Sequence, residues 1–166
     1  DFTKAYTTKA FSCKALQTVG DGKLTYKSSN PAVATIDENG QMTAKGIGQT
    51  IITVTASSTK NYKKATKTFV VTIKLATPTI SKMKEPSTTS MKLTWKKNSL
   101  ATGYTIRYST SKSMSKAKVV TMTRNTTVSK TIKNLKKNTT YYVQMRSNDA
   151  NGGFDSSWSS VKIVEK

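Results

Sequence analysis

The chain has 166 residues, and its 28 Lys and Arg against 8 Asp and Glu give a net charge of +20. This length fits one or two domains, and a 35% hydrophobic share can bury modest cores but not one large core. His is absent, so the usual neutral-pH general base and the usual partner of a nucleophilic Ser or Cys are both missing. We therefore expect no enzyme and no cofactor.

The sequence also limits the kinds of partner that the chain is expected to bind. It has no apolar run long enough to span a bilayer, and its polar start, DFTKAYTTKA, contains no signal peptide, so we expect a piece of a longer protein. The net charge attracts polyanions, but only 3 of the 28 basic residues are Arg, the side chain that suits bidentate recognition of phosphates and base edges. We expect diffuse polyanion attraction and no specific nucleic-acid partner.

In chain order, the first notable residue is Cys13, the only Cys, which excludes an internal disulfide and a cysteine zinc cluster. It alternates with polar neighbours in AFSCKA, which predicts a small buried side chain; a reactive thiol is the alternative. Further on, short segments alternate between apolar and polar residues, with breaks of the spacing typical of all-β sandwiches. These segments are residues 50–56, 68–73, 91–95, 104–108 and 140–147.

The stretch SSNPAVATIDENGQMTAKGIG contains Asp37 and Glu38, the only adjacent acidic pair in the chain. They stand with Asn39-Gly40 between the alternating runs 33–36 and 41–44. Asn-Gly supplies the positive φ angles of a tight hairpin, and an Asp at the turn start accepts hydrogen bonds from backbone N–H groups ahead of it. The stretch therefore predicts a turn, with adventitious cation binding as the alternative.

A boundary is predicted near residues 75–78, because Pro78 fixes its own φ and pushes Thr77 towards extended geometry. We expect two tandem immunoglobulin-like β-sandwiches, residues 1–75 and residues 76–166. Their net charges are +7 and +13.

The first part resembles the bacterial immunoglobulin-like domain of group 2. The resemblance lies in the SSNP-x-VAT block, the Asn-Gly turn and the KG-x-G-x-x-x-ITVTA block, and it extends to YKKATKTFVVTI. It implies a small β-sandwich in an extracellular bacterial protein, used as a spacer or an adhesive module.

The second part resembles a fibronectin type III domain of a secreted Gram-positive protein, through LTW, GYTIRYS, LKKNTTYYVQMRS and SSWSSVKIV. The resemblance implies that Trp95 lies in the core and that Tyr141 forms a tyrosine corner, with its hydroxyl bonded back to the preceding loop. With Leu135 and Pro78, these are the expected structural residues. No Arg-Gly-Asp occurs, so integrin binding is not implied.

Two groups of residues are candidate ligand contacts. Exposed aromatic rings can stack on sugars, and the loop 148–158, NDANGGFDSSW, is the first choice, against the alternative that its rings are structural. The candidates for this role are Tyr62, Asn148, Phe154, Asp155 and Trp158. Two lysine clusters form either a solvated face that protects edge strands or a contact for wall polymers. These are Lys112, Lys116, Lys118, Lys130, Lys133, Lys136 and Lys137.

The sequence thus predicts non-catalytic spacer and interaction modules of a larger secreted or cell-surface bacterial protein. Other domains of the parent chain are the expected partners. The alternative is a module that binds carbohydrate or cell-wall polymer, including one that accompanies a polysaccharide-degrading enzyme.

Overall fold

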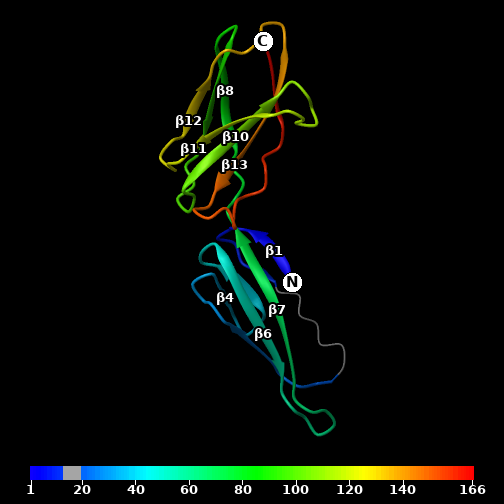
Figure 1. The fold of residues 1–166 in the computed structure, drawn as a ribbon. Helices are drawn as coiled ribbons and strands as arrows, with labels where there is room; N and C mark the ends of the chain where they lie inside the picture. Colours follow the sequence, from blue (N-terminus) through cyan, green and yellow to red (C-terminus); the bar gives the residue numbers. More distant parts are fainter. Residues whose placement is uncertain (13–19) are drawn as a thin grey trace. The chain divides into compact units, whose positions relative to one another are not determined.

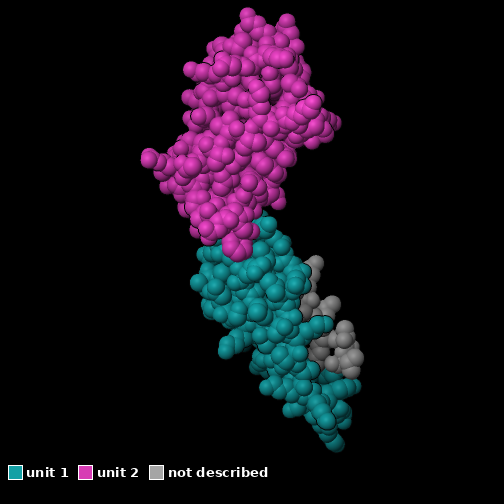
Figure 2. Space-filling model, viewed as in Figure 1, with its two compact units in different colours: residues 1–74 teal, residues 75–166 magenta. Residues whose placement is uncertain are grey.

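The structure is a computed structural model that describes residues 1–12 and 20–166. Cys13 lies outside the described residues. All regular elements of the described part are β-strands (Figure 1), which confirms the predicted all-β class. The chain divides into two compact units, Asp1–Lys74 and Leu75–Lys166 (Figure 2).

Unit 1 is a sandwich of two sheets. Its strands are β1 (Phe2–Ala5), β2 (Phe11–Ser12), β3 (Leu24–Ser28), β4 (Ala34–Ile36), β5 (Gln41–Ala44), β6 (Gly48–Ala56) and β7 (Ala65–Lys74). One sheet has the order β1-β7-β6-β3 and the other β2-β5-β4, and β1 pairs with β7 in parallel. The core forms where Met42 of one sheet packs with Ile52, Val71 and Ile73 of the other. Burial alternates along the first five residues of β6, as a strand with one face on the core requires.

The acidic pair lies in the predicted turn, between β4 and β5. Asp37 Oδ1 accepts hydrogen bonds from Asn39 N at 2.9 Å and from Gln41 N at 2.8 Å, which closes the hairpin. Of the Asn-Gly pair only Gly40 has a positive φ, 73°, so the expectation of positive φ at both residues was wrong. The connection has four residues rather than two, and Asn39 therefore keeps an ordinary φ while Gly40 alone makes the left-handed step.

Unit 2 is also a two-sheet sandwich. Its strands are β8 (Ile80–Ser87), β9 (Ser90–Trp95), β10 (Gly103–Ser109), β11 (Lys118–Met122), β12 (Ser129–Ile132), β13 (Thr140–Asn148) and β14 (Lys162–Glu165). The sheets have the orders β12-β9-β8 and β11-β10-β13-β14. Trp95 of the first sheet meets Tyr104 of the second edge to face, with ring centres 5.4 Å apart, and both rings are buried.

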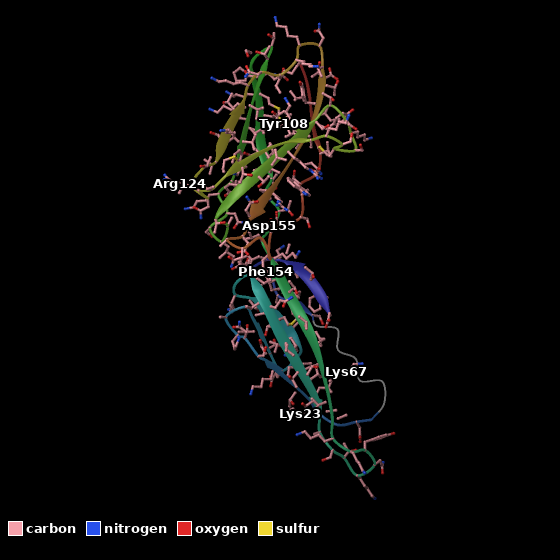
Figure 3. All side chains as sticks on the ribbon, viewed as in Figure 1. Lys23, Lys67, Tyr108, Arg124, Phe154 and Asp155 are labelled. Atoms are coloured by element: carbon pink, nitrogen blue, oxygen red, sulfur yellow. The ribbon has the colours of Figure 1, made fainter. Side chains whose placement is uncertain are left out.

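The register of β10 and β13 decides where the loops of unit 2 lie. Gly103 pairs with Asn148 at one end of the antiparallel pair, and Ser109 pairs with Tyr142 at the other. The loop that follows β13 is therefore at the first end, where Figure 3 labels Phe154 and Asp155. The loops that follow β10 and precede β13 meet at the second end. The aromatic-loop candidates thus belong to the first end, and Lys112, Lys116, Lys136 and Lys137 belong to the loops at the second end, whereas Lys130 lies on β12 of the other sheet.

Candidate functional site

The aromatic loop is held against β13 by two serines three residues apart. Ser156 N donates to Ser147 O at 3.1 Å and Ser147 N donates to Ser156 Oγ at 2.9 Å. Ser159 repeats the pattern with Met145, at 2.8 Å and 3.1 Å. Both serines are buried. The segment SSWSS therefore continues the sheet edge as an extended framework, and Trp158 is fixed between its two anchors.

The indole ring of Trp158 is covered by two arginines of the same sheet. The guanidinium carbon of Arg107, on β10, lies 4.2 Å from the ring centre, and that of Arg146, on β13, lies 5.0 Å from it. Arg107 donates from Nε and Nη2 to Gln144 Oε1, at 3.0 Å and 2.6 Å. Arg146 forms an ion pair with Asp155 at 3.0 Å. This arrangement favours a structural role for the half-buried ring over an open stacking platform.

The other candidates around this loop also make contacts within unit 2. Asn148 Nδ2 donates to Thr105 Oγ1 at 2.8 Å, and Asp155 Oδ1 accepts from Asp149 N at 2.8 Å. The carbonyl of Phe154, whose side chain is half-buried, accepts from Leu75 N at 2.9 Å. The structure thus brings together the four candidates from unit 2.

Tyr62 belongs to unit 1, in the connection between β6 and β7. It is 46% exposed, and its carbonyl accepts a hydrogen bond from Thr59 N at 2.9 Å. Of the aromatic candidates, Tyr62 is the exposed residue, whereas Phe154 and Trp158 are half-buried.

The expected structural residues are buried in unit 2. Trp95 is 2% exposed, Leu135 is 5% exposed, and Pro78 is buried at the start of the unit. The Tyr141 hydroxyl accepts a hydrogen bond from Lys136 N at 3.0 Å, so it ties β13 back to the loop that precedes it. This is the geometry of a tyrosine corner.

The seven candidate lysines are all exposed. In the described part of the chain, the ion pairs are Arg146–Asp155 and Lys166–Glu85, so none of the seven is paired with a carboxylate. Their positive charge is thus left for solvent and for partners.

Part of each lysine cluster meets at a cavity of about 270 Å³, at the end of the sheet where β10 ends and β13 begins. We call it the lysine pocket. Among its lining residues are Tyr108, Ser109, Ser115, Lys116, Lys118 and Lys136. Lys112, Lys130, Lys133 and Lys137 do not line it. Sequence reasoning missed Tyr108 and the serines, because their approach to Lys136 depends on the folding of two loops about twenty residues apart.

Other kinds of site have less support in the described residues. No group of three or more His, Cys, Asp or Glu side chains is placed there to hold a metal ion. Residues 1–12 and 20–166 contain no helix long and apolar enough to cross a membrane.

Comparison with family models gives two matches. The model of the fibronectin type III domain matches residues 76–162, which is more than half of the chain. The chain belongs to the fibronectin type III family. A second model, the immunoglobulin-like domain of intimin, matches residues 6–58. The first unit is therefore similar to an immunoglobulin-like domain, and its assignment to group 2 is not confirmed.

Solved structures with the fibronectin type III fold are similar to the chain as well. A two-domain fibronectin type III segment of chicken tenascin has a TM-score of 0.55 at 15% identity, over 86% of this chain and 82% of its own. The FN1–FN3 domains of chicken CNTN1 have a TM-score of 0.48 at 19% identity, over 87% of this chain. The chain spans 55% of that CNTN1 segment. No curated protein matches the sequence.

These matches define the class of the protein. Fibronectin type III and immunoglobulin-like domains are generally non-catalytic modules of larger chains, and they are typical of extracellular or cell-surface proteins. The tenascin likeness supports the β-sandwich fold.

Proposed function

We propose that the chain is a two-module spacer within a larger secreted or cell-surface bacterial protein, with one module in each of the two units. The observation that carries the proposal is that two consecutive residues, Lys74 and Leu75, are hydrogen-bonded within unit 1 and unit 2 respectively. Lys74 pairs with Ala5 in unit 1, and its carbonyl accepts from Tyr6 N at 2.7 Å. The next residue, Leu75, is 1% exposed and donates to Phe154 O in unit 2.

This succession leaves no free residue to act as a flexible linker between the modules. Ala76 O accepts from Ser147 Oγ at 3.2 Å, and Pro78 has a fixed φ, so the chain stays held as it enters unit 2. A joint of this kind restricts motion between modules, whereas Gly/Ser-rich linkers behave as random coils. A restricted joint is what a semi-rigid spacer needs to position a neighbouring domain.

Nitrogen-15 relaxation of the full chain tests this proposal. We expect the amides of both units to report one common rotational correlation time. A variant with Gly-Ser-Gly-Ser inserted between Lys74 and Leu75 is the control, and we expect its units to tumble separately with shorter correlation times. Separate tumbling of the units in the unaltered chain would contradict the spacer proposal.

A second candidate function is retention on an anionic carbohydrate polymer of a cell wall. The observation that favours it is the set of seven exposed lysines without ion pairs. Contacts of this kind weaken as salt screens them, with a Debye length of about 10 Å at 0.1 M. Co-sedimentation with Gram-positive cell walls at low salt and at about 0.5 M salt tests it. Failure to sediment at low salt would refute it and would leave the spacer proposal intact.

A further inference from the structure

The lysine pocket is formed by segments that are distant in the sequence. Tyr108 and Ser109 end β10, Lys118 begins β11, and the loop between these strands contributes Ser115 and Lys116. Lys136, in the loop between β12 and β13, also lines the pocket. The pocket has a volume of about 270 Å³, which equals about nine waters at ~30 Å³ each. This volume is enough for an oxyanion and part of an attached sugar or polyol.

The charges around the pocket are all positive. Lys116, Lys118 and Lys136 contribute three ammonium groups, and no Asp or Glu is among the lining residues. These lysines form no ion pair with the described residues. Lysine ammonium groups are strongly hydrated point charges with three donors each, and they bind phosphate without the fixed fork of Arg. The pocket therefore favours a compact anion.

The pocket is also lined by a tyrosine, Tyr108. Tyr108 is 9% exposed, and in the described part of the chain its hydroxyl forms no hydrogen bond. Burial, and secondarily the nearby Tyr141, raises the pKa of Tyr108, so its hydroxyl stays protonated at neutral pH and can donate. The hydroxyl is therefore a hydrogen-bond donor for an acceptor bound in the pocket.

The pocket loops also contain unusual backbone. In the described residues four non-glycine residues have positive φ: Met114 (59°), Lys116 (50°), Asn134 (59°) and Asn138 (52°). All four belong to the two loops that form the pocket. Ser109 holds the first loop by donating from Oγ to Ser115 O at 2.7 Å. Sparsely populated conformations persist where the surrounding structure enforces them, and they cluster at ligand sites.

We propose that the lysine pocket binds a tetrahedral oxyanion group, a phosphate or sulfate ester, carried by an anionic carbohydrate polymer. The three lysines neutralise the charge, and the Tyr108 hydroxyl in the pocket lining donates a hydrogen bond. This inference rests on the second candidate function, retention on an anionic carbohydrate polymer. It adds that the polymer binds at one defined position and not only through diffuse attraction to the lysines.

Two variants with equal net charge distinguish binding at a defined position from diffuse attraction to the lysine surface. The pocket variant combines Lys116→Gln, Lys118→Gln and Lys136→Gln. The matched control combines Lys112→Gln, Lys130→Gln and Lys137→Gln, which removes the same charge from the same two clusters outside the pocket. All six side chains are exposed, so we expect both variants to keep the wild-type melting temperature.

Affinities are measured by calorimetry for poly(glycerol phosphate), dextran sulfate and neutral dextran, at low salt. We expect the pocket variant to lose about tenfold or more relative to the control, since a hydrogen bond to a charged group contributes about that factor. Tyr108→Phe changes no charge and removes only the unpartnered hydroxyl, so we expect a loss of about three- to tenfold. The anionic polymer that shows these losses identifies the ester.

Several results would contradict the proposal that the lysine pocket binds an oxyanion. Equal losses in the two lysine variants, with no effect of Tyr108→Phe, would mean that only diffuse attraction occurs, and the second candidate function would survive. Binding of neutral dextran with equal strength would mean that the oxyanion is not recognised. If the unaltered chain bound none of the three polymers, the pocket and the second candidate function would both be wrong.

Discussion

Trp158→Ala tests whether the most conspicuous ring of the aromatic loop is structural. The substitution removes two cation–π contacts, with Arg107 at 4.2 Å and Arg146 at 5.0 Å. Each is worth about 0.5–2 kcal/mol, depending on desolvation. Half-burial of an indole removes about 100 Å² of mostly apolar surface from water, or ~2.5 kcal/mol at 25 cal/mol per Å². After the entropy of fixing the loop, we expect unit 2 to lose about 2–4 kcal/mol.

The chain offers a convenient assay for this prediction. Its two tryptophans, Trp95 and Trp158, both belong to unit 2, so Trp95 fluorescence reports the unfolding of that unit in the variant. With a urea m-value of about 1.5 kcal/mol/M, a loss of 3 kcal/mol lowers the midpoint by about 2 M. Trp158→Phe is the matched control: it keeps an aromatic ring between the arginines, and we expect less than half the loss.

A midpoint shift below about 0.3 M, or ~0.5 kcal/mol, would refute this reasoning. It would mean that the arginines gain little from the ring and that Trp158 is free to serve as a stacking platform. Loss of sugar binding in the same variant would then support the carbohydrate alternative.

Two further predictions concern the tyrosines at the other end of unit 2. Tyr141→Phe leaves Lys136 N–H without its acceptor, and we expect unit 2 to lose about 1–2 kcal/mol, measured as the urea midpoint; an unchanged midpoint would mean that water replaces the hydroxyl. Because the folded pKa of Tyr108 is raised above 10.0, the native state holds its proton longer, so stability from this group is full below pH 10 and falls as pH rises through the folded pKa. We expect the midpoint to fall more between pH 9 and pH 11 in the unaltered chain than in Tyr108→Phe, and an equal fall would contradict the raised pKa.

The elements that the sequence predicted well are those specified by local patterns. The hairpin around Asp37 and Gly40 follows from turn chemistry within a dozen residues, and the strand 104–108 follows from alternation alone. Both signals involve residues that are close together in the sequence, within the length of one hairpin. The parallel pairing of β1 with β7 joins residues about seventy positions apart, and no local pattern indicates it.

For the candidate sites, too, local sequence patterns do not reveal which distant residues come together. The lysines are visible as clusters in the sequence, but which of them converge depends on how two loops close against the ends of β10 and β13. The choice of Trp158 as a candidate ligand contact considered composition and not hydrogen-bond pairing. Ser156 and Ser159, three residues apart, were the available signal, because both hydroxyls accept hydrogen bonds from backbone N–H groups of β13.

The aromatic loop and the proposed stiffness of the joint are connected through backbone contacts. Leu75 is fixed by a hydrogen bond to the carbonyl of Phe154, and that carbonyl is fixed only while its loop stays attached to β13. The attachment depends on the paired serines and on the ring of Trp158 between its arginines. A ring that leaves the sheet would therefore loosen the first residue of unit 2 as well as the loop. Under the two proposals above, the ring would stabilise the joint of the spacer, and the opposite end of the same sheet, with the lysine pocket, would bind the anion.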